Sequence, residues 1–166
     1  ATVTYFDIDY KNQIQALRGT PGILTNPLYA SFVKLNPTAA EVTALVNSGL
    51  PINNQINTSN VTFIVDGRRQ NLGRSIVKGI DFGVYYNWEM GKVKLDASFQ
   101  GTYYTKYLFE SVPGSGLNSV LGLINFPQKF RSQADIGAKL GMFSGRLTWN
   151  HLASYTNNTL TPVQKV

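Results

Sequence analysis

Residues 79–104 read GIDFGVYYNWEMGKVKLDASFQGTYY, and this stretch decides the fold. Apolar and polar side chains alternate along it with a period of two, as they do along a β-strand. The apolar set comprises Ile80, Phe82, Val84, Tyr86 and Trp88 in the first arm and Val93, Leu95, Ala97, Phe99 and Tyr103 in the second. Residues 89–92 supply a short turn. Two-faced strands about ten residues long, with aromatics towards both ends, are typical of membrane β-barrels; one solvated face of a soluble β-sandwich remains the alternative.

The composition favours the barrel. Charged residues make up 14% of the 166 residues and aromatics 12%, whereas soluble domains average about a quarter charged. The chain has no cysteine, which excludes disulfides and thiolate metal sites. No run approaches the ~18 apolar residues of a membrane-spanning helix.

The net charge of +6 includes a cluster of basic residues just before the hairpin, Arg68, Arg69, Arg74 and Lys78. Because no nucleic-acid-binding module surrounds this cluster, we expect it to meet anionic lipid head groups or solvent.

The same alternation recurs along the rest of the chain. It predicts antiparallel strands that neighbour one another in sequence order near residues 2–14, 73–88, 93–108, 129–140 and 146–156, with turns at 89–92 and 141–145. Long irregular loops, at about 15–72 and 106–127, connect the predicted strands that are not joined by these turns. In the first of these loops, Asn36 as the cap and Pro37 at the first helical position predict a helix that runs through Val46; a short β-like run follows at 61–65.

Short turns at one end and long loops at the other are the arrangement of outer-membrane barrels. We therefore predict an all-β fold: an antiparallel up-and-down transmembrane β-barrel segment of about five long strands, with long extracellular loops, one of which contains a short helix. Single-chain barrels have an even number of strands, at least eight, and open edges do not occur in lipid. We therefore expect residues 1–166 to be a partial barrel domain.

Several segments then resemble a known family, the TonB-dependent outer-membrane receptors. Residues 4–14, TYFDIDYKNQI, resemble the strand before a major extracellular loop. NLG at 71–73 followed by VKGIDF at 77–82 is similar to the recurring strand entry of the family, and PQKFR at 127–131 resembles the opening of a later barrel strand. The loop segments 29–33, YASFV, and 36–40, NPTAA, are also similar to those of large receptors of this type.

The resemblance implies a 22-stranded barrel with an N-terminal plug, which imports a scarce ligand with energy passed on by TonB. The ligand classes are iron–siderophore complexes, cobalamin and oligosaccharides. The sequence departs from the family pattern because it shows no plug domain, no TonB-contact segment and no terminal aromatic residue; it ends Gln164-Lys165-Val166. We expect a portion of the C-terminal half of the barrel, in the outer membrane of a Gram-negative bacterium, in contact with outer-membrane lipid and lipopolysaccharide.

Two sets of residues are candidates for function. The polar alternate positions predict side chains that face the lumen: Asp81, Asp96, Gln100, Asp135 and Lys139. If the resemblance holds, the small-molecule ligand first meets aromatic side chains on the loops and the lumen wall, namely Tyr29, Phe32, Tyr104, Tyr107, Phe109 and Phe126. Rigid aromatic surface suits ligand capture. A place in the outer interfacial girdle explains Tyr103, Tyr107 and Phe109 equally well, whereas Tyr29 and Phe32 lie far from any predicted strand.

An enzyme is not expected. The aspartates share the polar face with Lys11, Lys94 and Lys139, so cross-strand pairing explains them better than paired-carboxylate catalysis. His151 is the only histidine, so few residues are available that could form a catalytic triad or bind a metal ion. We expect no cofactor, no metal and no nucleic-acid partner. A passive porin-type barrel and a soluble secreted carbohydrate-binding β-sandwich remain the alternatives to a TonB-dependent receptor.

Overall fold

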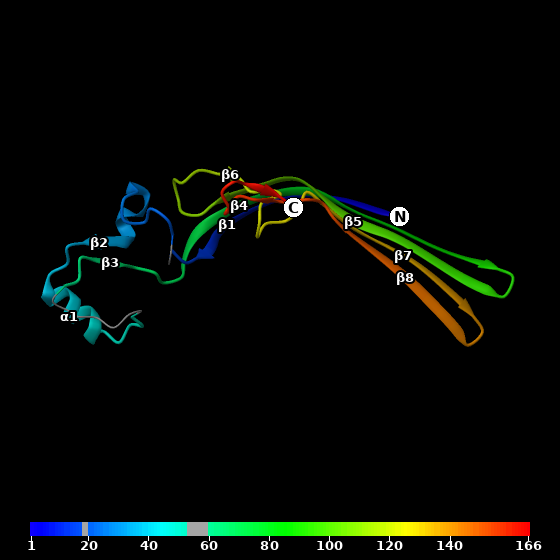
Figure 1. Ribbon diagram of the computed structural model, residues 1–166, viewed down its shortest axis with the longest axis horizontal. Coiled ribbons are helices and arrows are strands. Elements are labelled where there is room, and N and C mark those ends of the chain that lie inside the picture. Colours follow the sequence, from blue (N-terminus) through cyan, green and yellow to red (C-terminus); the bar gives the residue numbers. More distant parts are fainter. Residues whose placement is uncertain (18–19, 53–59) are drawn as a thin grey trace. The chain divides into compact units, whose positions relative to one another are not determined.

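The computed structural model describes residues 1–17, 20–52 and 60–166. Two compact units make up the chain (Figure 1). The strand unit consists of Ala1–Lys11, Arg74–Glu110 and Gly116–Val166, and the loop unit of Asn12–Gly73 and Ser111–Ser115.

The strand unit is built on one antiparallel sheet. Its long strands lie in the order β1-β4-β5-β7-β8, with the bounds β1 Thr2–Gln15, β4 Gln70–Met90, β5 Val93–Glu110, β7 Phe130–Leu140 and β8 Phe143–Leu152. Each long strand therefore pairs with its neighbours in sequence, as the alternation predicts. Short strands complete the unit: β6 (Asn118–Ser119) beside β5, and β9 (Thr156–Asn157) paired with β10 (Gln164–Lys165). Among the described residues, no helix has the length and apolarity needed to cross a membrane.

Both tight turns are shorter than the sequence indicates. β4 continues to Met90 and β5 restarts at Val93, so the first turn is Gly91-Lys92. The prediction of a five-residue second turn at 141–145 is wrong: β7 ends at Leu140, β8 begins at Phe143, and β8 ends at Leu152. Gly91 and Gly141 have φ angles of 61° and 57°, and glycine at such an angle allows the two-residue hairpin loop that matches the twist of the strands. Both turns lie at the same end of the sheet, the turn end (Figure 1).

The register gives the sheet two chemically different faces. Across β4, β5, β7 and β8, one row runs Val84, Phe99, Ala134 and Trp149, and the next row runs Tyr85, Ser98, Asp135 and Thr148. Opposed residues share a face, and successive rows alternate. We call these the apolar face and the polar face. The apolar face is exposed in the isolated chain: Val84 is 49% and Trp149 57% accessible, which is the property expected of a surface whose solvent is lipid.

A β-bulge interrupts this alternation. Gly79 is opposite Tyr104, but Lys78 is opposite Lys106, so Thr105 is an extra residue on β5. The bulge leaves β4 alternating and shifts β5 by one position. As a result Tyr107, opposite Val77, stays on the polar face together with Tyr104.

The loop unit has a small core of its own. Leu17, Tyr29 and Val112 are buried together, and further apolar residues pack against them: Ile23, Phe32, Val33 and Leu72. The elements of this unit are η1 (Pro27–Phe32), the antiparallel pair β2 (Val33–Leu35) and β3 (Phe63–Val65), and α1 (Ala39–Asn47).

The expected helix exists, but its predicted start is wrong. The N-cap is Thr38, whose hydroxyl accepts from the Glu41 N–H while the Glu41 carboxylate accepts from the Thr38 N–H. This capping box provides partners for two backbone N–H groups at the start of the helix that have none within it. Asn36, the predicted cap, has a φ of 49° and precedes the helix. A hydrogen bond from Lys34, with the bonds from Thr38, lowers the pKa of Glu41 to about 2.

Candidate ligand-contact site on the polar face

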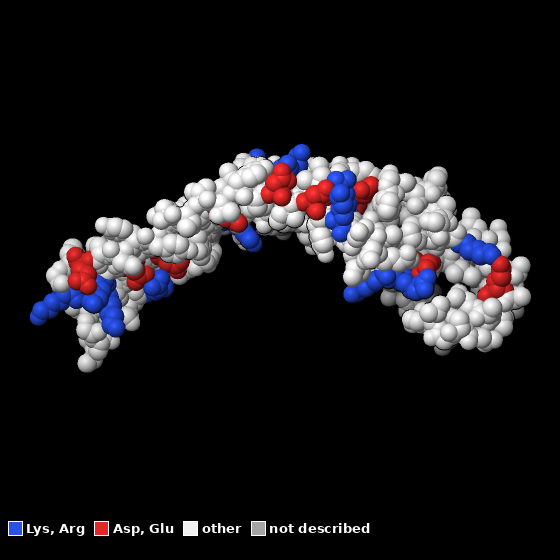
Figure 2. All heavy atoms as spheres, turned by 180° about the vertical axis from the view of Figure 1, so that it is seen from behind, with Lys and Arg blue, Asp and Glu red and all other residues white. Residues whose placement is uncertain are grey.

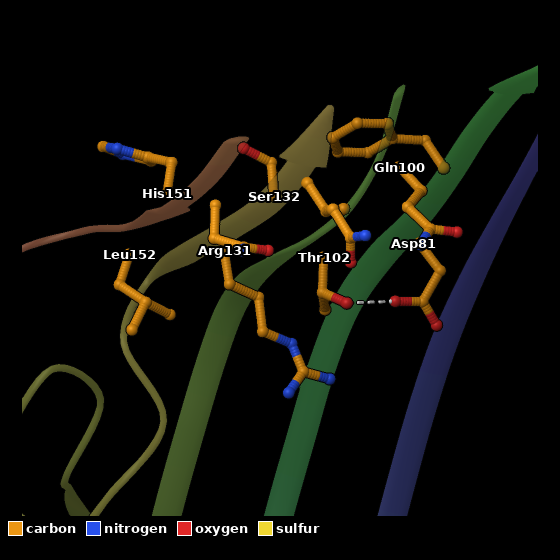
Figure 3. Close-up of a pocket in the computed structure, with 11 residues that line it drawn as sticks. Asp81, Gln100, Thr102, Arg131, Ser132, His151 and Leu152 are labelled. Carbon is orange, nitrogen blue, oxygen red and sulfur yellow. Dashed lines mark hydrogen bonds between the residues drawn. The ribbon is translucent and has the colours of Figure 1, made fainter. Parts of the chain in front are cut away.

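A hollow of about 560 Å³ near the bulge is bordered by two polar-face rows and by the row between them, which belongs to the apolar face and consists of Phe82, Gly101, Ser132 and His151. One polar-face row runs Asp81, Thr102, Arg131 and Leu152, and the other contains Gln100, Gln133 and Asn150. Four strands therefore supply the site, and their register brings residues that are far apart in the sequence into two lines. Figure 3 shows the side chains of Asp81, Thr102 and Arg131 on one side of the sheet and those of Ser132 and His151 on the other.

Arg131 is the exposed cation of this site. Its guanidinium carbon lies 6.0 Å from the centroid of the Tyr104 ring, within the range of a cation–π contact. Within the described part of the chain, Arg131 forms no ion pair. Asp81, in the same row, accepts a hydrogen bond of 2.7 Å from the Thr102 hydroxyl (Figure 3). The Arg131 N–H donors therefore have no carboxylate partner among the described residues.

Most of the other polar-face residues bind one another. Asp135 accepts from Thr148, Ser98 and Gln133 at 2.5, 3.3 and 3.0 Å, and Gln100 accepts from Tyr85 at 2.8 Å. The expected cross-strand pairing of carboxylates thus exists, but its partners here are hydroxyls and amides.

The Asp96 carboxylate forms an ion pair with a side chain two strands away. It pairs with Arg146 at 2.6 Å, from β5 to β8, and so joins two strands that are not neighbours. The intervening position on β7 is Gly137, where a Cβ would overlap the Asp96 carboxylate. Lys139, opposite Lys94, is exposed near the turn end. That this face lines a lumen stays a prediction.

The structure divides the predicted aromatic contacts into three groups. Tyr104 packs edge-on against Phe6, with ring centroids 5.8 Å apart. Tyr107 and Phe109 both contact Phe126, at 6.0 and 5.9 Å between ring centroids. Tyr107 and Phe109 lie opposite Val77 and Ser75, and hence on the polar face; the bulge that puts them there has no evident signal in the sequence. Their contact with a ligand stays a prediction.

The third group, Tyr29 and Phe32, belongs to the loop unit. Tyr29 is only 8% accessible and lies in the small core, with Phe32 partly buried against it. In this conformation the Tyr29 ring contributes to packing. Its role in ligand contact stays a prediction.

Several acidic and basic side chains on the strands form ion pairs. Acidic and basic side chains lie beside one another on the face drawn in Figure 2, and Arg74–Asp9 and Lys78–Asp7 are such pairs, at 2.8 and 2.6 Å. Among the described residues, no three His, Cys, Asp or Glu side chains are grouped as they would be to hold a metal ion. His151 instead stacks on Trp149, with ring centroids 5.6 Å apart.

Comparison with known proteins agrees with this architecture. No curated protein and no solved structure gives a significant match. The sequence model of the family described as "TonB dependent receptor-like, beta-barrel" matches residues 1–164. This match covers nearly the whole chain and both units of the structure. The chain therefore belongs to the TonB-dependent receptor-like β-barrel family.

Proposed function

We propose that residues 1–166 form part of the barrel wall of a TonB-dependent receptor, which takes up a scarce small-molecule ligand across the outer membrane of a Gram-negative bacterium. The family match and the two-faced sheet support this proposal. The family is one of receptors and transporters. We assign the apolar face to lipid and lipopolysaccharide, the polar face to the lumen, and energy coupling to TonB acting through a plug domain.

The observation that carries the ligand proposal is Arg131. An exposed guanidinium without an ion pair in the described chain, beside the ring of Tyr104, combines a planar donor fork with an aromatic face. Such a pair suits a ligand that carries an anionic group next to an aromatic or sugar ring. Ferric siderophores match this chemistry best among the three ligand classes; cobalamin and oligosaccharides are the alternatives.

The test uses the full-length receptor in cells with and without TonB. Uptake is measured with a panel of ferric siderophores, cyanocobalamin and oligosaccharides. We expect one class to be taken up only when TonB is present. Binding of that class should weaken about 10-fold or more in Arg131→Gln, because a hydrogen bond to a charged group contributes about 1.5–3 kcal/mol.

Lys139→Gln is the matched control, since it removes the same charge from the same face near the turn end. Tyr104→Ala should weaken binding without changing heat-modifiable folding of the barrel. Uptake that is independent of TonB would overturn the receptor proposal and favour a passive barrel. Unchanged affinity in Arg131→Gln would refute the proposed role of Arg131 in ligand binding, but it would leave the receptor proposal standing.

A further inference from the structure

Three primary amide side chains form one row across the polar face, which we call the amide row. Gln100 on β5 is directly opposite Gln133 on β7, and Gln133 is directly opposite Asn150 on β8. Directly opposed residues of an antiparallel sheet have Cβ atoms about 4.5–5.5 Å apart, so the three amides are neighbours. All three border the hollow of about 560 Å³.

The orientation of the Gln133 amide is fixed by a carboxylate. The Gln133 Nε2 donates to the Asp135 carboxylate at 3.0 Å. An ionised carboxylate can only accept hydrogen bonds, so the amino group of the amide must face Asp135 and the carbonyl oxygen Oε1 is turned away from it. Among the described residues, no donor is bonded to this carbonyl oxygen.

The Gln100 amide is held in the opposite sense. Its carbonyl oxygen Oε1 accepts from the Tyr85 hydroxyl at 2.8 Å, which leaves its amino group as the part that can bind another molecule. Gln100 and Gln133 are directly opposed, yet within the described chain their amides form no hydrogen bond with each other. The amide row therefore presents an N–H donor on β5 beside a carbonyl acceptor on β7.

A donor beside an acceptor, in a fixed order, is complementary to a peptide group. The carbonyl oxygen of a peptide group accepts and its N–H donates, and neither can change role. A sugar hydroxyl both donates and accepts, so recognition of a sugar gives no reason to hold the two amides in opposite senses. Asn150, at the end of the row, carries both a donor and an acceptor for the next group of the same ligand.

The neighbouring row adds a cation to this pattern. Arg131 precedes Gln133 by two residues on β7 and lies on the same face, at a distance of about 7 Å along the strand. Each residue of an extended peptide spans about 3.3–3.6 Å. An anionic group one or two residues from the bound peptide group therefore reaches the guanidinium of Arg131, whose fork of N–H donors matches a carboxylate.

We propose that the amide row and Arg131 recognise an anionic ligand built on a peptide backbone. The Gln100 amino group donates to a peptide carbonyl oxygen of the ligand, the Gln133 carbonyl oxygen accepts from the N–H of the same peptide group, and Arg131 binds the anionic group. This assignment rests on the proposed function and narrows it. Among ferric siderophores, we expect one built on a peptide backbone rather than one built on citrate.

The first test changes the ligand. Binding to the detergent-purified full-length receptor is measured by titration calorimetry with a ferric hydroxamate siderophore on a peptide backbone, the same compound methylated at its peptide nitrogens, ferric citrate and maltohexaose. Methylation removes the N–H that Gln133 accepts, so the methylated compound should bind about 5-fold or more weakly. Equal affinity of the two compounds would overturn the proposal, as would binding of ferric citrate or maltohexaose without binding of the peptide compound.

The second test changes the receptor. Gln133→Met keeps the length of the side chain and removes the acceptor, so the two peptide compounds should bind this variant equally. Gln100→Met removes the donor and should weaken binding of the peptide compound by about 2- to 12-fold, the value of one neutral hydrogen bond. The matched control is Asn87→Leu, which removes an amide from the same face, opposite Asp96 and towards the turn end; it should change neither affinity.

Two results of the second test would refute the amide row. One is a preference for the unmethylated compound that persists in Gln133→Met, because methylation would then act through the shape of the ligand. The other is an equal loss of affinity in Gln100→Met and Asn87→Leu. Uptake is followed in the same strains with and without TonB. TonB-dependent uptake of ferric citrate or maltohexaose alone would refute the amide row and leave the receptor proposal standing, whereas uptake without TonB would refute the proposed function.

Discussion

Ala97 and Ser98 are adjacent on β5 at the same height, yet they face opposite ways. Ala97 is opposite Tyr86 and Ile136 on the apolar face, and Ser98 is opposite Tyr85 and Asp135 on the polar face. Ala97 is four residue steps from the start of β5 at Val93, or about 10 Å in height at the usual tilt, near the centre of a ~25 Å apolar band.

Arginine at position 97 would therefore place its charge near the bilayer midplane. Such a substitution costs about 2–4 kcal/mol, which is about a 30- to 800-fold change in the folding equilibrium. Arginine at position 98 would lie on the polar face opposite Asp135, so Ser98→Arg should change stability by no more than about 0.5 kcal/mol. Small side chains are replaced in both variants, which makes them matched controls for each other.

The assay is reversible urea unfolding of the full-length receptor in phospholipid vesicles, followed by heat-modifiable gel mobility. Ala97→Arg should shift the midpoint downwards at unchanged slope, and Ser98→Arg should leave it in place. Equal destabilisation by the two substitutions, or a larger effect at position 98, would show that the assignment of faces to lipid and lumen is wrong.

Three further predictions concern single sites. Gly101→Leu should cost ~1–3 kcal/mol by overpacking, because a Cβ there would lie 2.6 Å from the Arg131 carbonyl oxygen; Gly145→Leu, with open space, should cost less in the same urea assay. The pKa of Glu41 is lowered from 4.5 to about 2. The stabilisation of the loop unit by the Glu41 carboxylate is therefore complete above pH 4.5 and is lost as the pH falls towards 2. Protection of the loop unit from hydrogen exchange should fall with pH in this range, and the variant Glu41→Gln should lack this pH dependence. Tyr29→Ala should cost the loop unit ~3–5 kcal/mol, and unchanged exchange there would contradict its place in the core.

The long strands and their order were predictable from the sequence because strict alternation over ten or more residues is rare outside two-faced β-strands. The register of a two-faced strand is fixed by the cost of turning its apolar set to the wrong side. For that reason the sets containing Phe99 and Asp135 could be separated from sequence alone. Element ends were less accurate, as at Phe143, because a two-residue turn with glycine at its first position leaves room for longer strands.

Features that depend on contacts between distant segments were not predictable. The bulge at Thr105 has no local signature, yet it decides that Tyr107 lies on the polar face. Similarly, β1 alternates correctly, but its aromatic Phe6 packs on Tyr104 on the polar face, because Asp7 and Lys78 form their ion pair on the other. Tyr29 lies between two predicted strands in an irregular segment, where no periodicity indicates that it is buried.

The ion pair between Asp96 and Arg146 has a consequence for assembly. Because it passes over Gly137 to connect the first and third of three successive strands, it can form only after the β7–β8 hairpin has joined β5. A slip of β8 by one residue would turn Arg146 towards the opposite face and prevent the bond. The pair therefore stabilises only the arrangement in which the third strand is correctly aligned.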